Sequence, residues 1–72
     1  MNTLDLHGIR HHEVERRVED FVLLNGSPLK IITGNSSTMK AIVEEVLQKY
    51  DLRSEPESDY NLGAIIVYEF PT

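Results

Sequence analysis

The sequence contains no cysteine, so neither a disulfide framework nor a thiolate metal site can stabilise the fold. This composition suits a reducing compartment, and we expect a cytoplasmic protein. No stretch approaches the roughly 20 apolar residues that a membrane-spanning helix needs. The first residues also lack the basic segment and apolar run of a secretory signal. The sequence therefore predicts a soluble protein without a membrane partner.

An excess of positive charge is missing too. The formal net charge is −5 at pH 7, whereas a generic nucleic-acid-binding protein carries a basic patch. The charges balance over residues 1–40, however, and the whole acidic excess follows Lys40. A polyanion could therefore still approach the N-terminal part of the chain.

The chain is short, with 72 residues. This is near the lower size at which a single apolar core holds a fold without help. No internal repeat, linker or low-complexity segment divides it. We expect one domain over residues 1–72, with modest stability.

Hydrophobic periodicity predicts secondary-structure elements in the order β-α-β-α-β-β. Strand-like alternation covers 3–7, and β-branched or apolar runs cover 29–33 and 64–70. Apolar residues at helical spacing cover 11–24 and 39–50, the second stretch following several helix-capping residues at 35–38. The remaining predictions are turns at 25–28 and 61–63 and, at best, an edge strand within 52–59.

The first strand, helix and second strand should form a right-handed crossover with parallel strands. Such a crossover brings the carboxyl ends of both strands, and the amino ends of both helices, to one edge of the sheet. The segments Leu4–Gly8 (LDLHG) and Thr33–Ser37 (TGNSS) are therefore predicted to meet there.

LDLHG has the composition of an acid–base site. Asp5 and His7 lie on one face of the predicted strand, with Cα atoms about 6.6 Å apart. An imidazole titrates near neutral pH, and a neighbouring carboxylate can orient it and stabilise its charged form. Gly8 permits a sharp change of chain direction directly after the strand.

TGNSS has the composition of an anion-binding loop. The backbone amides at the start of the following helix, together with its dipole, would attract an anion such as phosphate. Gly34 would let the backbone come close to that ligand, and Lys40 could add a positive charge. His7 would then face a bound phosphodiester.

Both segments also have an explanation without a ligand. Asp5 and His7 fit the exposed face of an amphipathic strand, and Gly-Asn-Ser-Ser fits a turn and helix cap. Arg10 is either a surface charge or a phosphate contact, and the sequence alone does not separate the two. His11 and His12 are typical of a solvated helix start, so the histidines make a weak metal site.

These features resemble the Smr domain, the small MutS-related domain. Leu4–Gly8 corresponds to its N-terminal LDxH motif, and Thr33–Ser36 to its central HGxG or TGxG motif, with Ser36 in place of the second glycine. The element order and a closing strand that begins at Gly63-Ala64 also agree, so the resemblance covers almost the whole chain. It implies a two-layer α/β sandwich in which a mixed four-stranded sheet carries two helices on one face.

Members of this family bind nucleic acid, and several nick or cleave DNA or RNA. The resemblance implies that Asp5 and His7 are catalytic and that Thr33 and Gly34 form the loop that supports or binds the nucleic-acid backbone. We therefore expect a small endonuclease acting on RNA or DNA phosphodiesters. The candidate nucleic-acid- or phosphate-binding residues are Gly8, Arg10, Thr33, Gly34, Asn35, Ser36, Ser37 and Lys40.

Two other functions remain open. One is a non-catalytic module that positions a partner, such as a larger protein, on nucleic acid or a ribosome. The other is a protein-interaction domain in which Glu55, Glu57 and Asp59 meet a basic partner. Cleavage of RNA requires no cofactor if His7 activates the 2′-hydroxyl group. Cleavage of DNA by water favours a divalent metal, although no ligand motif supports one.

Overall fold

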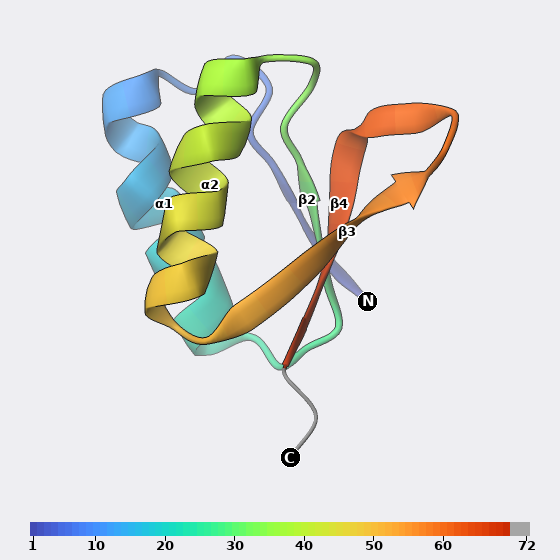
Figure 1. The fold of residues 1–72 in the computed structure, drawn as a ribbon. Helices are drawn as coiled ribbons and strands as arrows, with labels where there is room; N and C mark the ends of the chain where they lie inside the picture. The colour runs from blue at the N-terminus through green and yellow to red at the C-terminus, as the bar shows by residue number, and fades with distance from the viewer. Residues whose placement is uncertain (70–72) are drawn as a thin grey trace.

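A computed structural model describes residues 1–69 of the chain (Figure 1). The element order is β-α-β-α-β-β, as the periodicity predicts. The elements are β1 (Asn2–Asp5), α1 (His11–Leu24), β2 (Leu29–Ile32), α2 (Ser37–Lys49), β3 (Leu52–Ser58) and β4 (Asn61–Glu69).

The four strands form one mixed sheet in the order β1-β2-β4-β3. β1 runs parallel to β2, while β4 runs antiparallel to both β2 and β3. Both helices lie on the same side of this sheet (Figure 1). The predicted two-layer α/β sandwich is therefore confirmed, and within residues 1–69 the opposite face of the sheet, here called the open face, carries no helix.

The hydrophobic core lies between the helices and the sheet. Val14 and Val18 of α1 and Val43 and Leu47 of α2 are fully buried, because a spacing of four residues keeps each pair on one side of its helix. Every second residue of a strand points to the same layer. The sheet layer contributes the buried residues Leu6, Leu29, Ile31, Ile65 and Val67.

β1 ends at Asp5, whereas the alternation predicted a strand through His7. The Oδ1 atom of Asp5 accepts a hydrogen bond from the His7 amide at 2.8 Å. The amide of Ile9 donates to the carbonyl of Leu6 at 3.0 Å, and Gly8 has a φ of 77°. The chain therefore turns at His7 and Gly8, and the predicted strand boundary was two residues too late.

The hairpin between β3 and β4 also differs from the prediction. The turn expected at 61–63 is formed by Asp59 and Tyr60 instead, and β4 begins at Asn61. Asn61 pairs with Ser58 across the hairpin, and its amide donates to the Ser58 hydroxyl oxygen at 3.0 Å. The asparagine and glycine that suggested a turn thus belong to the strand.

β3 is an edge strand, as predicted for this segment. Its pairing with β4 is irregular between Pro56 and Ser58, where proline cannot donate a ladder hydrogen bond. The prediction that the last strand reaches Phe70 falls outside the described residues. None of the helices within residues 1–69 is long and apolar enough to cross a bilayer.

Candidate functional site

The LDLHG and TGNSS segments lie side by side at one edge of the sheet. The parallel register pairs Asn2 with Leu29 and Asp5 with Ile32. One residue further, the Leu6 amide donates to the Ile32 carbonyl at 3.0 Å. Neighbouring strands are about 4.8 Å apart, so the two segments leave the sheet as neighbours. Figure 1 shows this edge at the top, where both helices begin.

Asp5 and His7 are both exposed at this edge. The hydrogen bond between them joins the Asp5 carboxylate to the backbone amide of His7, not to its imidazole ring. Leu6, between them, is fully buried and anchors the segment in the core. Asp5 therefore positions the His7 backbone, and the ring of His7 stands in solvent at the rim.

Thr33 supports the loop that follows β2. Its side chain is buried, and its hydroxyl lies 2.9 Å from the Gly34 carbonyl oxygen and 3.3 Å from the Gly63 carbonyl oxygen. The backbone amides of Thr33 and Gly34 both donate to the Gly63 carbonyl, at 2.8 and 2.9 Å. Because these two amides already donate within the protein, only the amides further along the loop can bind an anion.

Gly63 is a part of this site that the sequence reasoning did not assign. A Cβ atom at this position would lie 3.3 Å from the Cα and carbonyl carbon of Gly34, so the two backbones pack closely. Gly34 itself has a φ of 66°, which favours glycine. A glycine within an apolar strand was the signal that could have indicated this close approach.

Ser36 caps the second helix. Its Oγ atom accepts a hydrogen bond from the Met39 amide at 3.1 Å, and its carbonyl accepts one from the Lys40 amide at 3.1 Å. Within residues 1–69, the amides of residues 35–38 have no protein acceptor. Free amides at the start of a helix attract anions, so residues 35–38 are the part of the loop that can hold a phosphate.

The two candidate cations lie on different sides of the site. Arg10 is the exposed N-cap of α1, at the same edge as His7. Lys40 is half-buried and lines a groove of about 420 Å³ between α2 and the β3–β4 hairpin, together with Glu44 and Ser54. Arg10 is thus the more accessible of the two to a ligand at the rim.

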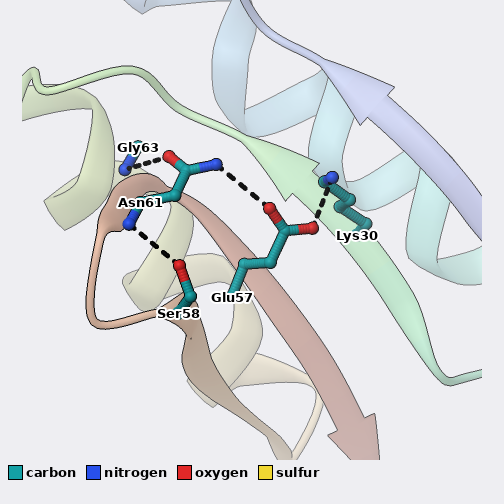
Figure 2. A network of polar contacts seen from close by, with 5 residues as sticks. All are labelled: Lys30, Glu57, Ser58, Asn61 and Gly63. Atoms are coloured by element: carbon teal, nitrogen blue, oxygen red, sulfur yellow. Dashed lines mark hydrogen bonds and ion pairs between the residues drawn. The ribbon is translucent and has the colours of Figure 1, made fainter.

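A set of polar contacts on the hairpin holds Gly63 in place (Figure 2). Lys30 and Glu57 form an ion pair, and Asn61 donates to Glu57 at 3.0 Å while accepting from the Gly63 amide at 3.2 Å. The hydrogen bond from Lys30, with a smaller one from Asn61, lowers the pKa of Glu57 below its usual value. We call Lys30, Glu57, Ser58, Asn61 and Gly63 the hairpin network; through the Gly63 carbonyl it holds the loop that follows β2.

The described residues offer no assembled metal site. Within residues 1–69, no group of three or more His, Cys, Asp or Glu side chains is placed to hold a metal ion. His7, His11 and His12 are all exposed near the start of α1. The site as built consists of an exposed imidazole, a carboxylate that holds its backbone, and an amide-lined loop.

Comparisons of the chain with protein-family models, with curated proteins and with solved structures found no match. The resemblance to the Smr domain therefore stays a prediction, which rests on Leu4–Gly8, Thr33–Ser36 and the order of the elements.

Proposed function

We propose that this protein is a small nucleic-acid endonuclease of the kind that the Smr resemblance implies. One observation supports the proposal: β1 and β2 are parallel neighbours, so the segment with exposed His7 and the segment that leads to the free amides of residues 35–38 leave the sheet side by side. A phosphodiester held by these amides would lie next to an imidazole that can transfer a proton. RNA and DNA are the proposed substrates.

On RNA, the proposed reaction needs only groups of this chain and of the substrate. The imidazole of His7 takes the proton of the 2′-hydroxyl, whose oxygen attacks the adjacent phosphorus. The bond from phosphorus to the 5′-oxygen breaks, and that oxygen takes a proton from the imidazolium or from water. The amides of residues 35–38 stabilise the charge on the phosphate oxygens. On DNA, water attacks instead, and a divalent ion would help to activate it.

Asp5 has two proposed roles that mutation can separate. Its carboxylate oxygen holds the His7 amide at 2.8 Å, and its negative charge would stabilise the protonated imidazole. Asp5→Asn keeps an oxygen acceptor and removes the charge, while Asp5→Ala removes both. We expect Asp5→Ala to lose about 0.5–1.5 kcal/mol of unfolding free energy and Asp5→Asn to lose less, with cleavage reduced in both.

The test is cleavage of labelled single-stranded RNA and of supercoiled DNA, with and without a chelator. His7→Ala should abolish product formation, since acid–base catalysis contributes typically 10²–10⁴-fold. His11→Ala, which removes an exposed imidazole to which we assign no role, should cleave as the wild type does. Equal activity of the wild type, His7→Ala and both Asp5 variants would reject the assigned roles.

A non-catalytic binding module is the second candidate. It is favoured by the engagement of the Thr33 and Gly34 amides with Gly63, which leaves fewer donors at the loop, and by the net charge of −5. Binding to nucleic acid that weakens steeply with salt, with no product formed, would support it.

The described contacts give less support to an acidic protein-interaction domain. Glu57 is engaged by Lys30 and Asn61, and Glu55 lies 3.5 Å from Arg53. Two of the three carboxylates expected to meet a basic partner are therefore already neutralised in part. A cytoplasmic location stays an expectation that rests on the lack of cysteine.

A further inference from the structure

The outer side of α1 carries two arginines and a histidine that the candidate site does not use. His12, Arg16 and Arg17 are exposed and line a shallow cavity of about 410 Å³ together with Glu13 and Asp20. Arg10 precedes them at the N-cap, next to the edge that carries His7. A row of arginines therefore continues from the candidate site onto the surface of the helix, where Glu13 and Asp20 accompany it.

Within residues 1–69, only one ion pair joins a carboxylate of α1 to an arginine of the same helix. Glu15 and Glu19 lie toward α2, each 3.6 Å from the Lys49 ammonium group. Glu13 lies 3.9 Å from Arg17 in a pair that is about half exposed and therefore weak. Within residues 1–69, no carboxylate lies within 4.0 Å of the guanidinium groups of Arg10 and Arg16. Asp20 lines the same cavity as Arg16 but forms no ion pair with it, so both guanidinium groups keep donors for an anion.

We propose that Arg10, His12, Arg16 and Arg17, here called the α1 track, bind the phosphate backbone of a single-stranded nucleic acid. The inference rests on the proposed function: the strand would continue along α1 from the phosphate held at the loop. Arginine suits this role because its planar guanidinium donates two parallel hydrogen bonds to a phosphate. The contacts are to backbone, so binding along the track does not depend on sequence.

The shape of the molecule favours a single strand over a duplex. From Arg10 to Arg17 the helix advances about 10.5 Å at 1.5 Å per residue. The loop amides lie on the rim where both helices begin (Figure 1), whereas the cavity lined by Arg16 and Arg17 lies further along α1, so a ligand that reaches both must bend from the rim onto the helix. A duplex has a persistence length of about 150 base pairs and resists so sharp a bend. A single strand follows it easily.

The salt dependence of binding tests the α1 track. Affinity for a fluorescent single-stranded RNA of mixed sequence is measured at several salt concentrations for the full chain. Each lost phosphate contact should reduce the slope of log K against log salt by about 0.7. We expect that reduction for Arg16→Gln and about twice as much, roughly 1.4, for Arg16→Gln combined with Arg17→Gln. The weakening should be the same for RNAs of different sequence.

Arg53→Gln is the matched control, since it removes the same charge from β3, the edge strand opposite β1 in the sheet. It should leave the slope unchanged. Glu13→Gln releases Arg17 from its ion pair and should strengthen binding. Equal slopes for Arg16→Gln, Arg53→Gln and the wild type would overturn the track. It would also be overturned if the α1 substitutions weakened the binding of a duplex as much as that of a single strand.

The two proposals fail in different ways. If the wild type neither binds nor cleaves nucleic acid, both the proposed function and the proposed role of the α1 track are wrong. If the wild type binds, its cleavage depends on His7, and the α1 variants still behave as the wild type, only the track is wrong.

Discussion

Ser36 lies at the position where the Smr motif has a glycine, and in the structure this serine is the N-cap of α2. Its Oγ atom accepts the Met39 amide and so caps α2. Sequence reasoning identified four possible caps at residues 35–38 but could not choose among them. Which residue becomes the cap depends on where β2 ends and the loop turns toward α2. The Gly63 carbonyl fixes that position, because it accepts hydrogen bonds from the Thr33 and Gly34 amides.

The Ser36 cap can be tested against the motif residue. Replacing a capping serine by alanine costs about 1 kcal/mol of unfolding free energy, whereas glycine costs only a few tenths. We therefore expect Ser36→Ala to be clearly less stable than Ser36→Gly in urea denaturation followed by circular dichroism. Equal losses for the two variants would show that the hydroxyl does not act as a cap.

Asp5 shows a similar limit of residue-scale prediction. The pair of Asp5 and His7 was correctly expected at the sheet edge, because strand alternation and crossover geometry decide that position. The partner of the carboxylate was not predictable. It depends on the turn at Gly8, which brings the His7 amide rather than the imidazole ring to Asp5.

The loop that follows β2 depends on a close approach between the Gly34 and Gly63 backbones. A Cβ atom at Gly63 would meet the Gly34 backbone at 3.3 Å, so Gly63→Ala should push the loop away from β4. We expect a loss of about 1–3 kcal/mol and weaker binding of RNA. Both are measured on the same sample, by urea denaturation and by fluorescence titration.

Gly26→Ala is the control for that change. Gly26 lies between α1 and β2, and an added Cβ atom there would meet nothing within 4 Å. Alanine at such a site usually stabilises by about 0.4–1 kcal/mol, because it restricts the unfolded chain. If Gly63→Ala were as stable as Gly26→Ala, the two backbones would not be in the contact described.

The hairpin network should make stability depend on pH. Contacts from Lys30 and Asn61 lower the pKa of Glu57 below its ordinary value of 4.5. Its stabilising effect is therefore fully present above pH 4.5 and is lost as the pH falls through the lower pKa of the folded state. Glu57→Gln should have a lower melting temperature than the wild type at neutral pH, and the difference should shrink in acid.

Glu45→Gln controls for the loss of one negative charge, since the Glu45 carboxylate has no ion pair or hydrogen bond within residues 1–69. Thermal unfolding of the three proteins across this pH range gives the comparison. A melting-temperature gap between wild type and Glu57→Gln that stayed constant into acid would contradict the role of the network.

At the scale of elements, the sequence pattern predicted those helix bounds that depend on neighbouring residues alone. The bounds of α1 follow from its apolar spacing, and they agree with the structure from His11 to Leu24. The hairpin was misread because Asn61 and Gly63 are typical turn residues. Asn61 pairs instead with Ser58, three residues earlier, and Gly63 accepts from the Thr33 and Gly34 amides, a contact that no local window contains.

Across the whole molecule, Leu6 links the candidate site to the core. It is fully buried between exposed Asp5 and His7 and packs with residues of both helices. Leu6→Ala should cost about 2–5 kcal/mol, a large part of the roughly 4–11 kcal/mol that a domain of this size has in total. Denaturant titration measures the loss.

Leu24→Ala provides the matched control, because this leucine is 81% exposed at the end of α1. Its replacement should change the unfolding free energy by no more than about 0.5 kcal/mol. Comparable losses for the two alanine variants would mean that Leu6 is not part of the core.

The overall arrangement was predictable because few topologies suit this order of elements. One β-α-β crossover fixes the parallel pair β1–β2, and a short hairpin makes β3 and β4 antiparallel neighbours. The contact that shapes the loop was not predictable, since it joins Thr33 to a residue 30 positions later. Such a pairing follows only from the completed sheet.

The hydrogen bonds from Thr33 and Gly34 to Gly63 also bear on how the protein is made. During translation, the Gly63 carbonyl becomes available only after both motif segments have been synthesised. A shortened chain that stops before Gly63 keeps LDLHG and TGNS intact but has nothing to hold the loop. Possession of the two motifs is therefore not sufficient to build the proposed site, and a chain cut before Gly63 should lose any phosphate binding there.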